Sequence, residues 1–250
     1  MASGKMEKKF SYFFKKYSFK KYSDPHASSV FFSLWNYSAI KYHRGLALII
    51  WRGTDILKFG SRLKTLKKRK NTYHVAISSY IAKDLDKYKI KYKCIPIVGV
   101  NNSHFKPVLM GDEIYVYMPL HNAKYKERYG KNVIDKVRKK CKYKINEISM
   151  GQYNRKKLAH IYEKSFCGFR FTQHDGLPNQ VIEMGLMGRR SFYNGNIPGS
   201  IKWSSQDINK IVRDIEEEAK KINTIDYDYA NVISNYVDSG DSWKNIDFWR

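Results

Sequence analysis

The chain has 250 residues, of which 42% are hydrophobic and 28% are charged. This length and composition allow one large or two small folded domains, and they exclude a disordered, fibrous or collagen-like chain. Lys and Arg number 47 against 23 acidic residues, so the net charge is +24. No apolar run approaches the roughly 18 residues that span a bilayer, and the first residues lack the pattern of a secretory signal. We expect a cytoplasmic protein (host cytoplasm if the source is viral) that could also lie peripherally on a membrane.

The positive charge is concentrated in the N-terminal half. Residues 1–110 hold 23 basic and 5 acidic side chains, whereas the rest of the chain holds 24 and 18. This asymmetry indicates that the N-terminal half faces a polyanion or an anionic surface. In residues 1–22, aromatic side chains at helical spacing alternate with lysines. Such a helix could lie on anionic lipid, stack on nucleic acid or pack on its own domain.

The first half of the chain alternates between helical and strand patterns. Hydrophobic spacing predicts helices over 28–42 and 79–88, with a very basic segment over 58–70 between them. Continuous apolar runs predict three buried strands, over 46–51, 73–78 and 94–100. The polar segment 101–107 ends in proline and predicts a linker between domains.

The alternation starts again after the linker. Strands are predicted over 113–117, 143–148, 169–172 and 190–193. Helices are predicted over 132–140, 155–165, from 178 onward and over 208–222. Strands that alternate with helices indicate parallel sheets covered on both faces. We therefore predict an α/β protein with two facing Rossmann-like domains, over 1–105 and 106–225, and a C-terminal clasp over 226–250.

The strongest local signal lies between residues 169 and 188. A strand is predicted to end at Thr172, a tight turn at Asp175-Gly176 exposes backbone N–H groups, and a helix begins with Pro178 at its first position. A helix N-terminus binds anions, so a nucleoside diphosphate is the natural ligand. Glu183 lies one to two turns into this helix, where its carboxylate could accept both ribose hydroxyls. The alternative is a structural turn followed by an ordinary surface glutamate.

This segment resembles the donor-site signature of GT-B glycosyltransferases of the large family-4 type. Asp175 and Glu183 take the two acidic places and Gly176 takes the glycine, although Asp replaces the more usual Glu at the first place. Three upstream segments are also similar to that family, and the resemblance extends over roughly residues 45–220. These segments are Ile49–Asp55, His74–Ser79 and Ile95–Pro107.

The resemblance implies a metal-independent, retaining glycosyltransferase that uses a nucleotide sugar, with a UDP-sugar expected, and no cofactor. Asp175 would contact the donor sugar, and the loop over 117–130 would supply cations to the diphosphate. Lys124 takes the first basic place of that loop, but Tyr129 occupies the second, so Lys126 or Arg128 would substitute. The N-terminal domain is shorter than the family usually has. The expected catalytic residues are Asp175, Arg52 and Lys124. The expected donor-binding residues are Glu183, Gly176, Leu177, Pro178, Asn179, His174, Thr172, Lys126 and Arg128.

In this family the N-terminal domain faces the acceptor, so the basic half suggests a polyanionic one. One candidate is DNA with a hydroxymethylated pyrimidine, whose base would have to be flipped out of a duplex; another is a glycan or glycolipid at an anionic membrane. A non-catalytic nucleic-acid-binding protein on a transferase scaffold is a third reading, which the short N-terminal domain favours. The residues expected to bind a polyanion are Arg62, Lys64, Lys67, Lys68, Arg69 and Lys70.

Two features of the sequence bear on whether the protein holds a metal or a disulfide. Asp226-Tyr227-Asp228 matches the Asp-x-Asp metal motif of another glycosyltransferase fold, but it lies far from the donor signature, and we interpret it as a surface loop before a C-terminal helix. Cys94, Cys141 and Cys167 are far apart and form no metal-binding spacing. We expect no metal site and no disulfide framework.

Overall fold

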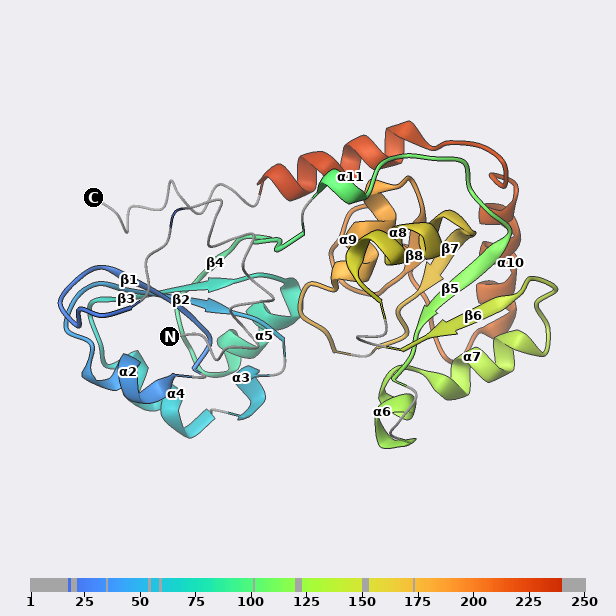
Figure 1. The fold of residues 1–250 in the computed structure, drawn as a ribbon. Coiled ribbons are helices and arrows are strands. Elements are labelled where there is room, and N and C mark those ends of the chain that lie inside the picture. Colours follow the sequence, from blue (N-terminus) through green and yellow to red (C-terminus); the bar gives the residue numbers. More distant parts are fainter. Residues whose placement is uncertain are drawn as a thin grey trace. The chain divides into compact units, whose positions relative to one another are not determined.

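The computed structural model describes residues 18, 22–34, 36–53, 55–58, 60–100, 102–119, 123–149, 153–172 and 174–239. Contacts divide the chain into two compact units (Figure 1). The first unit comprises residues 1–99, 174–177 and 237–250, and the second comprises residues 100–173 and 178–236. The expected N-terminal helix over 1–22 falls almost wholly outside the described residues, as do residues 240–250 of the expected clasp. The predicted ranges for the domains remain predictions.

The first unit is built on a parallel sheet in the order β1-β2-β3-β4. Its strands are β1 (Ser29–Phe32), β2 (Ala47–Trp51), β3 (Thr72–Ala76) and β4 (Lys93–Cys94). Its helices are α2 (Tyr37–Tyr42), α3 (Asp55–Lys58), α4 (Gly60–Lys67) and α5 (Ser79–Lys87). All five side chains of β2 are buried, because this strand lies inside the sheet and both its faces are covered.

The predicted strands near 46–51 and 73–78 and the predicted helix near 79–88 are confirmed. The helix predicted over 28–42 is wrong in its first part: β1 pairs with β2 from Ser29 to Phe32, and only α2 is helical. Pairing with a buried neighbour overrides the local pattern there. The strand predicted over 94–100 ends at Cys94. Pro96 has no N–H to extend the ladder.

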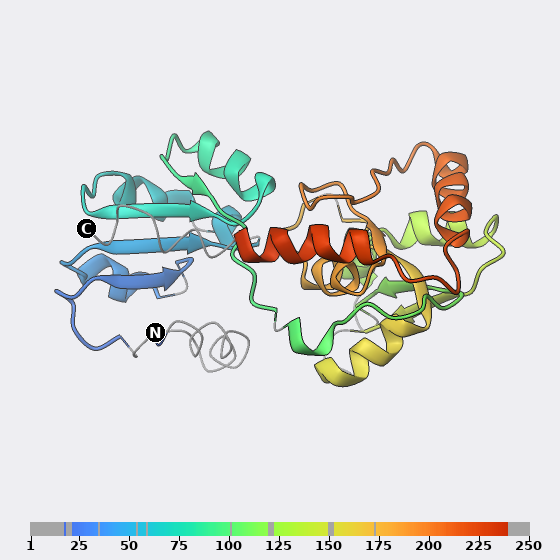
Figure 2. The same ribbon diagram turned by 90° about the horizontal axis from the view of Figure 1, so that it is seen from above.

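The second unit has a parallel sheet in the order β6-β5-β7-β8, whose strands are labelled in Figure 1. In Figure 2 the sheet of the first unit is the one whose strands are seen side by side, in colours from dark blue to green. Its strands are β5 (Glu113–Tyr117), β6 (Ile145–Ile148), β7 (Ser165–Phe169) and β8 (Arg190–Phe192). Its helices are η1 (Asn102–His104), α6 (Ala123–Arg128), α7 (Lys131–Arg138), α8 (Arg155–Glu163), α9 (Asn179–Leu186), α10 (Ile208–Ala219) and α11 (Tyr227–Ser239), of which the last three residues of α11 belong to the first unit. No described helix is long and apolar enough to cross a membrane.

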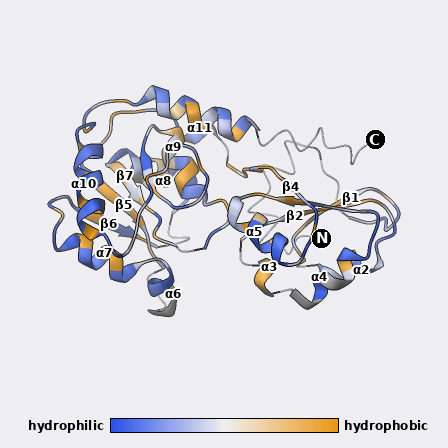
Figure 3. Ribbon diagram, turned by 180° about the vertical axis from the view of Figure 1, so that it is seen from behind, coloured by the Kyte–Doolittle hydropathy of each residue, from blue (hydrophilic) through white to orange (hydrophobic). Residues whose placement is uncertain are grey.

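The hydrophobic core of the second unit joins the sheet to α7 and α10 (Figure 3). Helix α10 contributes Ile211, Ile215 and Ala219, which follow the predicted helical stripe at intervals of four residues. The strand predicted over 169–172 is wrong in its position, because it was placed a few residues too far toward the C-terminus. The strand is instead Ser165–Phe169, whose five residues are all buried between β5 and β8. The predicted α/β class with parallel sheets is confirmed.

A buried arginine holds the amino-terminal edge of this second sheet. Arg189, just before β8, is 0% exposed and donates hydrogen bonds to five backbone carbonyls. Burial lowers the pKa of Arg189 to about 10, so the guanidinium stays charged at neutral pH. The acceptors lie before β5, around the start of β7 and before β8. They are the carbonyl oxygens of Ser165 (2.8 Å), Leu109 (2.7 Å), Met187 (2.5 Å), Glu163 (3.3 Å) and Val108 (3.4 Å).

Replacing Arg189 with Met should remove the guanidinium donors from all five carbonyls, of which Glu163 O would keep the N–H of Gly111. We expect the free energy of unfolding of the second unit to fall by about 3–5 kcal/mol. The measurement is the urea dependence of amide hydrogen exchange in β5 and β7. Arg213→Met, at an exposed site on α10, is the control. A loss below about 1 kcal/mol for Arg189→Met would contradict the structural role of this arginine.

A histidine is buried in the first unit beside a tryptophan. Trp51 Nε1 donates a 3.0 Å hydrogen bond to His74 Nδ1, and their rings stack. Burial lowers the pKa of His74 to about 4. The folded state therefore keeps His74 neutral, whereas the unfolded chain takes up a proton below about pH 6.5. Stability is complete above that pH and is lost as the pH falls toward 4.

We expect His74 to account for a loss of about 2–3 kcal/mol in the stability of the first unit between about pH 7 and about pH 4.5. Urea unfolding followed by tryptophan fluorescence at both pH values measures this loss. His74→Gln should remove the share of the pH dependence that His74 contributes, because the amide does not titrate and its oxygen can still accept from Trp51; the share of His43, whose pKa burial also lowers, should remain. His26→Gln, at an exposed histidine of the same unit, should leave the pH dependence as it is.

Candidate functional site

The sheet of the second unit has one point where ligands are expected. From β5 the chain passes to β6 on one side of the sheet, and from β7 it passes to β8 on the other side. In open parallel sheets, ligands bind at the carboxyl ends of the strands where the direction of winding reverses. Strands β5 and β7 are neighbours, with Val116 opposite Phe169 at their carboxyl ends. We call this place the switch point.

An arginine and two tyrosines gather at the switch point. Arg170 follows β7 directly, and its guanidinium lies 5.0 Å from the ring centre of Tyr117 and 4.8 Å from that of Tyr129. The two rings are themselves 5.2 Å apart. Such contacts between a cation and aromatic rings stabilise the charge and fix its orientation. The sequence analysis missed Arg170 because it placed this residue inside a strand that ends three residues earlier than expected.

Glu183 lies in α9, but it is not a surface glutamate. It is 4% exposed, and the hydroxyl of Tyr162 in α8 donates a 3.0 Å hydrogen bond to its Oε2. Burial raises the pKa of the Glu183 carboxyl, while the charge of Arg155 and the hydrogen bond from Tyr162 oppose that rise. The ring of Tyr115 in β5 packs edge-on against Tyr162 at 4.8 Å. The structure therefore excludes the surface alternative and leaves the expected ribose contact as a prediction.

The start of α9 differs slightly from expectation. Pro178 is the N-cap residue rather than the first helical residue, and no side chain caps the helix there. Leu177 and Pro178 are buried and Asn179 is half-buried. A ligand at this helix start would therefore meet mainly backbone groups and Asn179.

Buried polar atoms without partners occur in the sequence on both sides of the turn at Asp175-Gly176. In the described part of the chain, Thr172 Oγ1, His174 Nδ1 and Gln180 Oε1 have no hydrogen-bond partner. Thr172 is 2% exposed and Gln180 is 6% exposed. Buried polar groups are nearly always paired, so each exception needs an explanation, and a bound ligand is one.

The segment His174–Leu177 belongs to the first unit by its contacts. His174 Nε2 lies 2.7 Å from Oδ2 of Asp84 in α5, and the other oxygen of this carboxylate accepts from Lys87 at 2.9 Å. The ring of Tyr80 lies 5.6 Å from that of His174. Burial and the charge of Asp175 raise the pKa of Tyr80. Asp84 and Tyr80 were not predicted, because only the fold brings residues so far apart in the sequence into contact.

Two glycines meet in the same part of the first unit. A Cβ on Gly176 would lie 2.8 Å from the backbone nitrogen of Gly53, so no larger residue fits without movement. Gly53 has a φ of 63°, which favours glycine. The structure thus brings the backbone of Arg52-Gly53 to the turn at Asp175-Gly176. The roles expected for Arg52, His174 and Asp175 remain predictions.

The basic residues of the loop after β5 fall on α6. Lys126 is half-buried and Arg128 is exposed, while the side chain of Lys124 is outside the described part of the structure. Tyr129, which occupies the second basic place, has its ring against Arg170. The loop therefore presents two described cations, Lys126 and Arg128, shortly before Tyr129, whose ring contacts Arg170.

The predicted polyanion-binding cluster separates into two parts. Arg62, Lys67, Lys68 and Lys70 are exposed on or just after α4, and the side chain of Lys64 is not described. Arg69 is different, because it donates to the carbonyl oxygens of Ile40 and, at 2.6 Å, of His43. It holds the end of α2 through these hydrogen bonds, and its expected role as a phosphate contact remains a prediction. It also lines a pocket of about 350 Å³ with Lys41 and Arg44.

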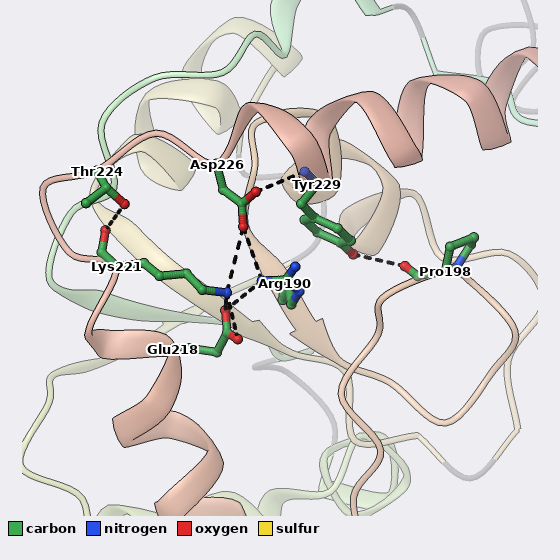
Figure 4. Close-up of polar contacts among 7 residues, drawn as sticks. All are labelled: Arg190, Pro198, Glu218, Lys221, Thr224, Asp226 and Tyr229. Atoms are coloured by element: carbon green, nitrogen blue, oxygen red, sulfur yellow. Dashed lines mark hydrogen bonds and ion pairs between the residues drawn. The ribbon is translucent and has the colours of Figure 1, made fainter.

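The Asp-x-Asp sequence is part of an internal network (Figure 4). Asp226 Oδ2 lies 3.1 Å from Arg190 and 3.7 Å from Lys221, and Asp226 Oδ1 accepts from the backbone of Tyr229 at 2.9 Å. Helix α11 begins at Tyr227, so Asp228 is helical rather than in the expected loop. Among the described residues, no group of three or more His, Cys, Asp or Glu could hold a metal ion.

No protein-family model and no curated protein sequence matches the chain. Sucrose-phosphate synthase from Thermosynechococcus elongatus is similar in structure, with a TM-score of 0.64, 13% identity, and coverage of 97% of this chain and 77% of that chain. TarM matches with a TM-score of 0.60, 10% identity, and coverage of 94% and 56%.

A variant of S. aureus TarM, solved with fondaparinux, alpha-GlcNAc-glycerol and UDP, matches with a TM-score of 0.58, 12% identity, and coverage of 95% and 55%. The chain therefore spans a little over half of the TarM chains. Similarity at these low identities shows the fold alone, and it confirms the predicted GT-B fold.

Tyr162→Phe should remove the only described hydrogen bond to the side chain of Glu183. The ionised carboxylate would lose stabilisation of about 1.5–3 kcal/mol, so the pKa of Glu183 should rise further. Carbon NMR titration of the labelled carboxyl measures this change. Tyr143→Phe, which removes a hydroxyl beside Phe166 in the same unit, is the control. An unchanged titration in Tyr162→Phe would show that the phenol does not hold the carboxylate.

Proposed function

We propose that the protein is a glycosyltransferase that takes its sugar from a nucleotide sugar, with a UDP-sugar as the first candidate. The observation that carries this proposal is the buried carboxylate of Glu183, on a helix that begins just after Asp175-Gly176. The GT-B fold shared with two kinds of glycosyltransferase supports it. So does the UDP in one TarM complex, which is a property of that protein.

Each group has a proposed role in the reaction. The carboxylate of Glu183 accepts hydrogen bonds from the ribose hydroxyls, and Asp175 accepts them from the hydroxyls of the donor sugar. As the bond to the sugar breaks, negative charge grows on the leaving diphosphate. The N-terminus of α9 and the cations Lys124, Lys126 or Arg128 stabilise this charge. These groups can replace a metal, and the resemblance to family 4 suggests a retaining reaction.

The acceptor is proposed to be polyanionic, because Arg62, Lys67, Lys68 and Lys70 form an exposed basic surface on the first unit. DNA and an anionic membrane are the two forms to test. Binding that falls steeply with salt would support DNA, with a log–log slope of about −0.9 for each neutralised phosphate. Co-sedimentation with anionic vesicles, lost when residues 1–22 are deleted, would support a membrane glycan or glycolipid.

The test of the donor reaction is a panel of nucleotide sugars in which nucleotide release is measured with and without EDTA. We expect release from at least one donor and no effect of EDTA. Strict dependence on a divalent metal would contradict metal independence. A protein that binds nucleic acid but neither binds nor cleaves any donor would favour the non-catalytic alternative.

Glu183→Gln should weaken nucleotide-sugar binding by about 1.5–3 kcal/mol, because an amide makes weaker hydrogen bonds to a diol than a carboxylate does. Asp175→Asn should lower turnover more than binding. Calorimetry and initial rates separate the two effects. Glu217→Gln and Asp86→Asn, at exposed acids, are the matched controls. Unchanged donor affinity in Glu183→Gln would remove this residue from the site.

A further inference from the structure

We propose that Arg170 binds the diphosphate of the nucleotide at the switch point and supplies the charge that Tyr129 does not. This inference rests on the proposed function and adds a residue to it. The loop after β5 carries tyrosine at its second basic place, so a cation from another element of the second unit can act there beside those of the loop. Arg170 lies beside this tyrosine although the two are far apart in the sequence.

The position of Arg170 follows from the topology of the sheet. It is the first residue after β7, and Tyr117 is the last residue of β5, so both stand at the carboxyl ends of the two central strands. Backbone hydrogen bonds hold the chain at both strand ends. Arg170 N–H donates to Phe192 O at 3.0 Å, and the N–H of Met118, the residue after Tyr117, donates to Ile148 O at 2.8 Å. This is where open parallel sheets bind their ligands.

The surroundings of Arg170 suit a guanidinium that must stay in one orientation. It lies against the rings of Tyr117 and Tyr129, and its own side chain is half-buried. Ring faces attract the cation and orient its plane. A planar guanidinium held in this way can present two N–H groups to one phosphate, which an ammonium group does less well.

A buried polar atom near Arg170 gives independent support. Thr172 N–H donates to the carbonyl of Arg170 at 2.8 Å, so the two residues are locked together. The hydroxyl of Thr172 is buried, and within the described residues it has no partner. A phosphate oxygen is a strong acceptor, and it could accept a hydrogen bond from this hydroxyl.

The test is calorimetric titration of the whole chain with UDP, uridine and inorganic pyrophosphate. Arg170→Gln should weaken UDP binding by roughly ten- to a hundredfold and leave uridine binding unchanged. Arg170→Lys should recover part of the loss, because it restores the charge but not the planar group. Arg213→Gln, at an exposed arginine of α10, should bind UDP like the unmodified chain. Circular dichroism checks that each variant is folded.

The outcomes separate this inference from the proposed function. Equal UDP binding by the unmodified chain and Arg170→Gln would overturn the inference and leave the proposed function standing. Equal losses for UDP and uridine would also overturn it, because Arg170 would then contact the nucleoside. If the unmodified chain bound pyrophosphate through Arg170 but bound no nucleoside diphosphate from a panel, the proposed function would fail and the anion site would remain. Binding of neither would overturn both.

Discussion

The second unit depends on a charge buried where water cannot reach it. Arg189 brings the carbonyl groups before β5, around the start of β7 and before β8 to one guanidinium. A buried cation is costly unless it is fully hydrogen-bonded, and this arrangement meets that condition with backbone oxygens alone. It fixes the amino-terminal edge of the sheet. Strands β5 and β7 are only five residues long and pair with each other as far as Val116 and Phe169, so their carboxyl ends are held close to that edge, and Tyr117 and Arg170 stand at these ends.

The two edges of this sheet therefore have opposite character. At the amino-terminal edge every donor of Arg189 finds an acceptor, and the polar groups there serve stability. At the carboxyl-terminal edge, Thr172 Oγ1 just after β7 and Gln180 Oε1 in the first turn of α9 are buried without a described partner. Buried polar groups of this kind reduce stability. Proteins tolerate such departures from local rules mainly where function requires them.

The sequence predicts the elements whose local pattern agrees with their packing. The strand near 46–51 is a continuous apolar run and β2 is wholly buried, whereas the strand near 113–117 begins with a glutamate and has its three central residues buried. The strand after α8 was placed four residues too late, because Phe169 and Phe171 are both buried and aromatic although only Phe169 belongs to β7. Phe171 packs against Phe169 and Trp203 after the strand has ended. Local hydrophobicity cannot distinguish these two positions.

The residues of the candidate site are likewise predictable only where a local pattern in the sequence marks them. Asp175, Gly176 and Glu183 stand out because their spacing along one turn and one helix is a local property. Tyr162, Asp84 and Arg170 do not stand out, since each acts on a residue that only the fold brings near. The burial of Glu183 likewise depends on α8 packing beside α9, and no pattern within 169–188 contains that information.

How many cations can pair with acidic side chains differs between the two units, and for the first unit the numbers of bases and acids already decide it. In the second unit many cations have acidic partners, such as Arg138 with Glu147, Lys144 with Glu113 and Lys221 with Glu218. Residues 1–99, the largest segment of the first unit, contain 5 acids for 22 bases, so no arrangement of side chains within this segment can pair most of its cations. Mutual repulsion then opposes compaction of the first unit, and salt or a polyanion reduces it. The basic surface around α4 is therefore a site where binding an anionic partner and stabilising the fold act in the same direction.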